Sequence, residues 1–254
     1  MTLILNEIHL IDGFNETMIV AAADRRLSIN GRYADTRQKL FEIPYLRGTV
    51  SYFGLAEVFP NGKNQLLSDW LPSFIRSQNH VKTLEEFSGN LREELHNVIP
   101  QETLSRYASG FHICGYNNQN IPEFWYLSNI GGLDGFNYVE TKPRYAEPSS
   151  DWLGRDAKNF GWDGKDLSSV TEKVIWVYRN GDFRGHAVAS EPLDRVFNTL
   201  FQFKDFKKPK TKDEYKEYVK TKFEIITYIY KKLNNTQIIG TPIDVVVLSS
   251  KDKK

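Results

Sequence analysis

The chain has 254 residues, of which 40% are hydrophobic, enough for one large folded domain with a substantial core. Its 33 basic and 32 acidic residues leave a net charge of +1, without the basic excess typical of a dedicated nucleic-acid binder. The single cysteine, Cys114, excludes an intrachain disulfide, and no stretch approaches the roughly 18 apolar residues of a membrane span. The start lacks the basic and apolar regions of a secretory leader. We therefore expect a cytoplasmic protein with no nucleic-acid or membrane partner.

The first 60 residues have the pattern of β-strands. Apolar runs at 3–10 and 18–23 stand on either side of Asp12-Gly13, a turn sequence that predicts a hairpin. Two further strands are expected at 41–43 and 49–53, and Pro44 marks the break between them.

The period of the apolar residues then changes from two to that of a helix. One helix is predicted where large apolar residues recur over 66–75. A second begins at Thr83, where Glu86 three residues later completes a capping box, and it ends at Pro100. Strands return at 110–116 and 124–127. Cys114 lies in the first of these apolar strands, which favours a buried core residue over a nucleophile.

The second half begins with a segment rich in Gly, Pro, Asp and Ser at 131–172, which we expect to run irregularly over the surface. A second hairpin is predicted, with strands 174–178 and 183–187 around Asn180-Gly181-Asp182. Helices are expected at 192–203 and 213–233, joined by a solvated lysine-rich linker at 204–212. A buried strand at 245–248 precedes an exposed tail at about 250–254.

The order of these elements is strands, two helices, strands, two helices and a final strand. It fits the α+β class, with helices outside a pair of stacked, mainly antiparallel sheets. No internal repeat and no Gly/Ser-rich linker divides the sequence. We therefore expect a single domain over 1–254.

Thr2 is the first candidate for chemistry. It follows Met1 and opens an apolar run. A threonine that becomes the first residue of a chain can use its own α-amine as the general base for its hydroxyl. That amine has an ordinary pKa of about 7.7–8.0, close to neutral pH, so it needs little adjustment for this role.

Several segments stand in a distinctive order and spacing along the chain. They are Thr2, V-A-A-A-D-R-R at 20–26, K-L-F-E-I at 39–43, G-T-V-S-Y-F-G-L-A-E at 48–57, F-H-I-C-G-Y at 111–116, W-Y-L at 125–127 and I-I-G-T-P-I-D-V-V-V-L at 238–248. This order and spacing resemble the proteasome β-subunits, which belong to the N-terminal-nucleophile (Ntn) hydrolase superfamily. The resemblance covers roughly 2–130 and 213–249 and implies a four-layer αββα sandwich and a ring-type homo-oligomer.

The resemblance also implies a site and a reaction. Thr2 Oγ would attack a peptide or amide carbonyl and form an acyl-enzyme, which water then releases. Lys39 would keep the threonine amine neutral, and Asp24 would hold Lys39 by a charge-assisted hydrogen bond. The oxyanion donor would be a backbone N–H near Phe53 or Gly54. We expect no cofactor and no metal, because the five histidines lack metal-ligand spacing.

Two departures from the family leave other interpretations open. The sequence has no Gly-Ser-Gly turn, and the stretch N-N-T-Q-I-I-G at 234–240 lacks the Asp of the family's late Asp/Ser pair. A catalytically inactive structural or assembly subunit with the same fold is therefore the main alternative, and an amidase acting on non-peptide substrates is another. Asp24 and Lys39 would then form an ordinary buried ion pair.

Overall fold

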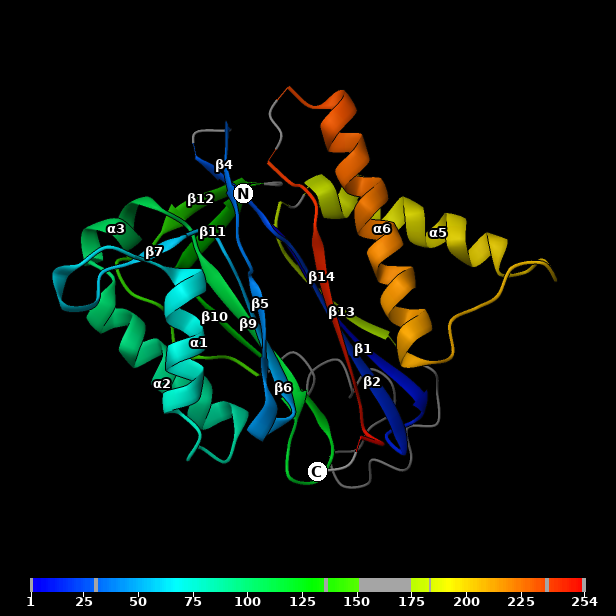
Figure 1. Cartoon of the computed structure of the whole chain (residues 1–254), viewed down its shortest axis with the longest axis horizontal. Coiled ribbons are helices and arrows are strands. Elements are labelled where there is room, and N and C mark those ends of the chain that lie inside the picture. Colours follow the sequence, from blue (N-terminus) through cyan, green and yellow to red (C-terminus); the bar gives the residue numbers. More distant parts are fainter. Residues whose placement is uncertain are drawn as a thin grey trace.

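A computed structural model describes residues 2–29, 32–134, 137–150, 175–182, 184–235 and 238–252. The fold is of the mixed α+β class (Figure 1). Its two larger sheets each have four strands, and every strand pair is antiparallel. In spatial order the first sheet contains β13 (Ile175–Gly181), β1 (Leu3–Asp12), β2 (Glu16–Asp24) and β14 (Ile243–Ser249), and the second contains β10 (Pro122–Ser128), β9 (Gly110–Tyr116), β6 (Gly48–Phe53) and β5 (Leu40–Ile43).

Helices and small two-stranded ribbons complete the structure. The helices are α1 (Leu67–Ser77), α2 (Leu84–Val98), α3 (Gln101–Arg106), α5 (Glu191–Leu200) and α6 (Lys212–Leu233). The ribbons pair β3 (Arg26–Ile29) with β4 (Arg32–Thr36), β7 (Glu57–Val58) with β8 (Gln65–Leu66), and β11 (Ile130–Asp134) with β12 (Asn137–Thr141).

The central strand β2 is apolar on both faces because both faces are covered. Val20 and Ala22 lie in a core beneath α6, whereas the alternating Ile19 and Ala21 lie in cores shared with the second sheet. Side chains along a strand point alternately to opposite faces, so one continuous apolar run serves two cores. The sheets therefore pack against each other through their inner faces.

The outer face of each sheet is covered by helices. Phe223 and Ile226 of α6 are buried against the first sheet, and Leu91 and Leu95 of α2 are buried in a core that also contains Ile113 of the second sheet. Figure 1 shows α1 and α2 on one side of the molecule and α6 on the other.

Several sequence predictions are confirmed. The hairpin around Asp12-Gly13 joins β1 and β2, and the helices expected near 66–75 and after Thr83 are α1 and α2. The Thr83 side chain accepts the Glu86 N–H at 3.1 Å, as a helix cap should. The Glu86 carboxylate, however, accepts the N–H of Lys82, one residue earlier than a capping box requires.

The hairpin predicted at 174–187 is wrong in its second half. Strand β13 pairs with β1, from Leu3 opposite Gly181 to His9 opposite Ile175. Beyond this strand the chain forms a π-helical turn at Gly185–Ser190 that leads into α5. The turn sequence around Gly181 therefore connects a strand to a helix. Strand β13 already has β1 as its hydrogen-bonded neighbour and does not need a second strand after the turn.

Two further predictions need correction. The segment expected to be irregular from residue 131 begins with the β11–β12 ribbon, although residues 151–174 lie outside the described part. The tail expected to be exposed from residue 250 is held to the body at its start. Ser250 is buried and its hydroxyl accepts the Thr17 N–H, and Asp252 pairs with Lys212.

Within the described ranges, no helix has the length and the apolar character that crossing a membrane would require.

Truncating Phe223 tests the core beneath α6. We expect Phe223→Ala to lower the free energy of unfolding by about 3–5 kcal/mol, because this fully buried ring leaves a cavity. Tyr228 on the same helix is 62% exposed, and its change to Ala should cost within about 0.5 kcal/mol. Urea denaturation of both variants measures the difference, and equal losses would contradict the assignment of the buried face.

Candidate active site

Asp24 ends β2 and has a completely buried carboxylate that accepts four hydrogen bonds. Its Oδ1 accepts the Leu3 N–H at 2.8 Å and the Lys39 ammonium at 3.3 Å. Its Oδ2 accepts the N–H of Arg26 at 3.1 Å and that of Gly240 at 3.3 Å. The carboxylate thus joins the start of β1, the start of β3 and the segment before β14 around one point.

Lys39 directly precedes β5, and its side chain is only 3% exposed. Its ammonium donates to Asp24 and to the Arg26 carbonyl. Burial lowers the pKa of Lys39 from its ordinary value, because the charged form loses its hydration, while Asp24 acts in the opposite direction. Lys39 is therefore a paired cation that gives up its proton more readily than a lysine in water.

Thr2 stands just before β1 and is buried. Its carbonyl accepts the Asp182 N–H at 2.8 Å. Gly181, the residue before Asp182, has a φ of +95°, and a Cβ at this position would lie 1.8 Å from the Thr2 carbonyl oxygen. Only glycine permits this approach. The turn that follows β13 therefore fixes the position of the Thr2 backbone.

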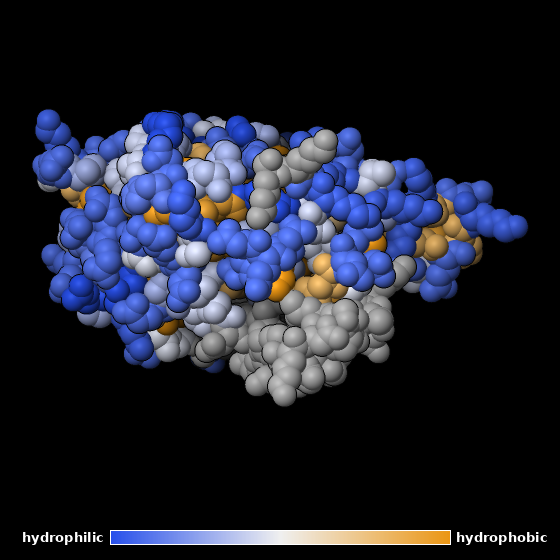
Figure 2. Space-filling view, turned by 90° about the horizontal axis from the view of Figure 1, so that it is seen from below, coloured by the Kyte–Doolittle hydropathy of each residue, from blue (hydrophilic) through white to orange (hydrophobic). Residues whose placement is uncertain are grey.

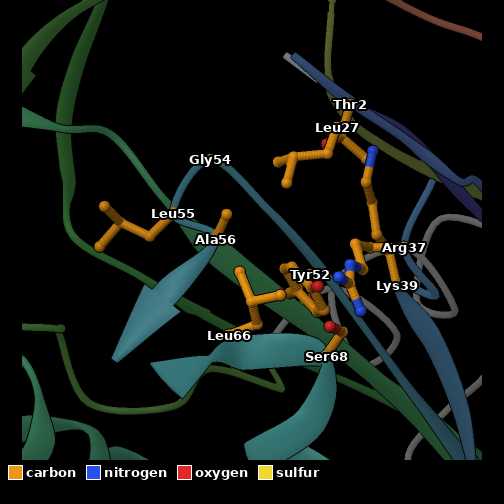
Figure 3. A pocket seen from close by; sticks show the side chains of 10 residues that line it. All are labelled: Thr2, Leu27, Arg37, Lys39, Tyr52, Gly54, Leu55, Ala56, Leu66 and Ser68. Carbon is orange, nitrogen blue, oxygen red and sulfur yellow. The ribbon is translucent and has the colours of Figure 1, made fainter. Parts of the chain in front are cut away.

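Thr2 and Lys39 line the same small pocket (Figure 3). Figure 3 shows the Lys39 side chain extending toward Thr2, while Arg37 lies beside Tyr52 and Ser68 on another wall. The space is narrow, about 10 Å³, which is room for about one water molecule. The remaining walls are formed by Leu27, Gly54, Leu55, Ala56 and Leu66.

Gly54 brings a backbone donor to this pocket. Gly54 directly follows β6 and lines the pocket, and no acceptor for its N–H occurs in the described ranges. Gly54 has a φ of +89°, and a Cβ there would lie 2.1 Å from the Ala108 oxygen.

Phe53, the other residue considered for the backbone donor, lies away from the pocket. Its side chain is buried in the core between the sheets and stacks on Tyr138 with ring centroids 5.7 Å apart. Of the two residues considered for the backbone donor, Gly54 is the one that lines the pocket.

The structure thus brings together Thr2, Asp24 and Lys39, the three residues singled out in the sequence. Sequence reasoning missed the turn at Gly181-Asp182 as a neighbour of Thr2, and it missed Arg37 and Ser68 as pocket walls. The turn sequence was visible, but its contact with Thr2 depends on the pairing of β13 with β1, which are more than 160 residues apart.

Among the side chains that the structure describes, no group of three or more His, Cys, Asp and Glu residues is arranged to hold a metal ion. No family model matches the sequence, and no curated protein matches it.

Replacing Lys39 by Met tests the buried cation through its pH dependence. Folding lowers the pKa of Lys39 below 10.5. At a pH between the pKa of the folded state and that of the unfolded state, Lys39 is therefore protonated in the unfolded chain but has released its proton in the folded chain. In that range the free energy of unfolding rises with pH, and below it the cost of burying the charge applies in full.

We expect the free energy of unfolding of the wild type, relative to Lys39→Met, to increase as the pH rises toward 10.5. Urea denaturation between about pH 8 and pH 10 measures it. The exposed Lys216→Met is the matched control and should show no such trend. Parallel pH profiles for wild type and Lys39→Met would exclude a lowered pKa.

Proposed function

We propose that the protein is an N-terminal threonine hydrolase that cleaves peptide or amide bonds, built as a four-layer αββα sandwich of the Ntn type. The observation that carries the proposal is the arrangement around one pocket of a threonine, a buried lysine held by Asp24, and a backbone N–H from Gly54. Acyl transfer needs a nucleophile, a base and an oxyanion donor around a common space. The two sheets with helices on their outer faces support the fold assignment.

The reaction begins when Thr2 carries a free α-amine, after removal of what precedes it, which in this sequence is Met1. The amine takes the proton of Thr2 Oγ as the oxygen bonds to the substrate carbonyl carbon. The Lys39 ammonium disfavours protonation of the resting amine and stabilises the developing negative charge. The Gly54 N–H donates to the carbonyl oxygen as it becomes an oxyanion.

The acyl transfer is completed when the C–N bond breaks and the leaving amine takes the proton from the Thr2 amine. Water then attacks the ester, releases the acid and restores the Thr2 hydroxyl. Each proton moves between Thr2 and the reacting groups, so the step needs no cofactor.

A catalytically inactive structural subunit with the same fold is the second candidate. Two observations favour it. The pocket has space for only about one water molecule. The turn that contacts Thr2 has Asp182 after Gly181, so it lacks the serine of the family's Gly-Ser-Gly turn. Substrate hydrolysis separates the two candidates directly.

We expect Thr2→Ala to abolish hydrolysis of a mixed fluorogenic peptide library, because it removes the nucleophile and keeps the amine. Lys39→Ala should lower the rate by about 10²–10⁴-fold, the usual loss when assistance to proton transfer is removed. Thr2→Ser keeps both hydroxyl and amine and should retain part of the rate. The measurement uses protein shown by intact mass to begin at Thr2.

Thr199→Ala, an exposed threonine on α5, serves as the matched control and should leave the rate unchanged. Equal cleavage by wild type and Thr2→Ala would place the chemistry elsewhere. A wild type that begins at Thr2 and cleaves nothing in a broad peptide and amide panel would support the inactive subunit.

A further inference from the structure

Polar side chains gather in the interior around the turn at 180–182, which holds the Thr2 backbone. The coloured part of the face in Figure 2 is mostly hydrophilic, and its apolar residues form small separate groups. Such groups are ordinary on a surface, whereas a cluster of buried polar groups needs a specific reason. Around this turn the polar groups come from four strands, β1, β9, β10 and β12. The contacts of the turn therefore bear on where Thr2 lies.

One of these groups, the Tyr138 hydroxyl, comes from outside the two large sheets. Tyr138 lies on β12, which pairs with β11 in a separate ribbon. Its neighbours Asn137, Val139 and Glu140 are exposed, whereas Tyr138 is half-buried and its ring packs against the core between the sheets. Figure 1 shows the ribbon at the same end of the molecule as the N-terminus. Through Tyr138 the ribbon thus reaches the interior behind the site.

The Tyr138 hydroxyl makes two hydrogen bonds with the turn. It accepts the Gly181 N–H at 3.1 Å and donates to Asn180 Oδ1 at 3.4 Å. Burial raises the pKa of the Tyr138 phenol, so the group stays a neutral hydroxyl that can both accept and donate. Gly181 is buried, and losing the partner of a buried N–H is costly. The hydroxyl therefore holds the turn in place.

The ring of Tyr138 contacts a second element of the site. It stacks on Phe53, which directly precedes Gly54 in the pocket wall. Tyr138 itself is not one of the described residues that line the pocket. It also lies in the segment 131–172, which the family resemblance does not cover. Tyr138 thus supports two sides of the pocket from behind, one with its ring and one with its hydroxyl, and this support belongs to the chain's own ribbon.

We propose that Tyr138 is a positioning residue of the candidate active site. Its hydroxyl holds Gly181, the N–H of the next residue holds the Thr2 carbonyl, and the Thr2 amine and hydroxyl thereby keep their place beside Lys39. The inference rests on the proposed hydrolysis, in which position is decisive. Displacing a reacting group by about 1 Å can lower a rate about 10²-fold. Tyr138 acts through the turn and contacts no reacting atom.

The variant Tyr138→Phe removes the hydroxyl and keeps the ring and its stacking on Phe53. Without the hydroxyl the turn should open more often, so the amide hydrogen of Asp182, which is bonded to Thr2, should exchange about five- to tenfold faster. NMR measures this exchange without any substrate. Tyr45→Phe is the matched control, because it removes another half-buried hydroxyl, bonded to the Ile75 carbonyl at 2.8 Å. It should leave the Asp182 exchange unchanged.

Hydrolysis of a single fluorogenic peptide by protein that begins at Thr2 tests the consequence for the reaction. In Tyr138→Phe we expect kcat to fall about 10- to 100-fold, with KM within about twofold because the pocket walls remain. The acid limb of the pH profile should move to higher pH, since an amine displaced from the Lys39 ammonium holds its proton more tightly. Partial loss of folded protein would lower kcat but leave this limb in place.

The outcomes separate the positioning from the hydrolysis. Circular dichroism verifies that both variants are folded. Unchanged Asp182 exchange in Tyr138→Phe overturns the proposal, and so does faster exchange with an unchanged kcat and acid limb. A wild type that begins at Thr2 and cleaves nothing contradicts the proposed hydrolysis instead. In that protein, faster Asp182 exchange in Tyr138→Phe alone would still support Tyr138 as the residue that holds Thr2, and equal exchange would overturn it.

Discussion

The buried carboxylate of Asp24 is the interaction on which the site depends. It accepts the N–H groups of Leu3, Arg26 and Gly240 together with the Lys39 ammonium. A buried charge is tolerated only when it is paired and fully hydrogen-bonded, and breaking such a pair costs about 3–5 kcal/mol. One carboxylate thus holds β1, β3, the start of β5 and the segment before β14 in register, so the geometry around Thr2 follows from the need to satisfy it.

A second polar network supports the turn that holds Thr2 from the other side. His112 lies in the middle of β9, and burial lowers its pKa to about 3, so its ring is neutral. One ring nitrogen lies 2.9 Å from Asn6 Oδ1 and the other 2.7 Å from Asn180 Nδ2, which assigns the proton to Nδ1. Asn180 directly precedes Gly181, so this network connects the two sheets to the turn beneath Thr2.

The buried ion pair of Asp24 and Lys39 lies beside the pocket that Thr2 lines. Replacing a buried ion pair by apolar residues often leaves stability unchanged or increases it, so such a pair is weak support for stability alone. Here the lysine of the pair borders a pocket together with a threonine and the N–H of Gly54. Perturbed lysines beside a cleft are typical of sites that move protons. The position of the pair beside Thr2 is what supports the proposed chemistry.

The sequence by itself determined the elements whose patterns are local: the β1–β2 hairpin, the helices α1, α2 and α6, and the apolar strand β14. Period, turn residues and caps act over a few positions, which is why they can be found without a partner. Only the tertiary structure decided that β13 pairs with β1, and thereby that Gly181 and Asp182 lie against Thr2. It also decided that Gly54, not Phe53, lines the pocket, because these contacts join residues far apart in the chain, and no local pattern encodes which distant strand will supply a partner.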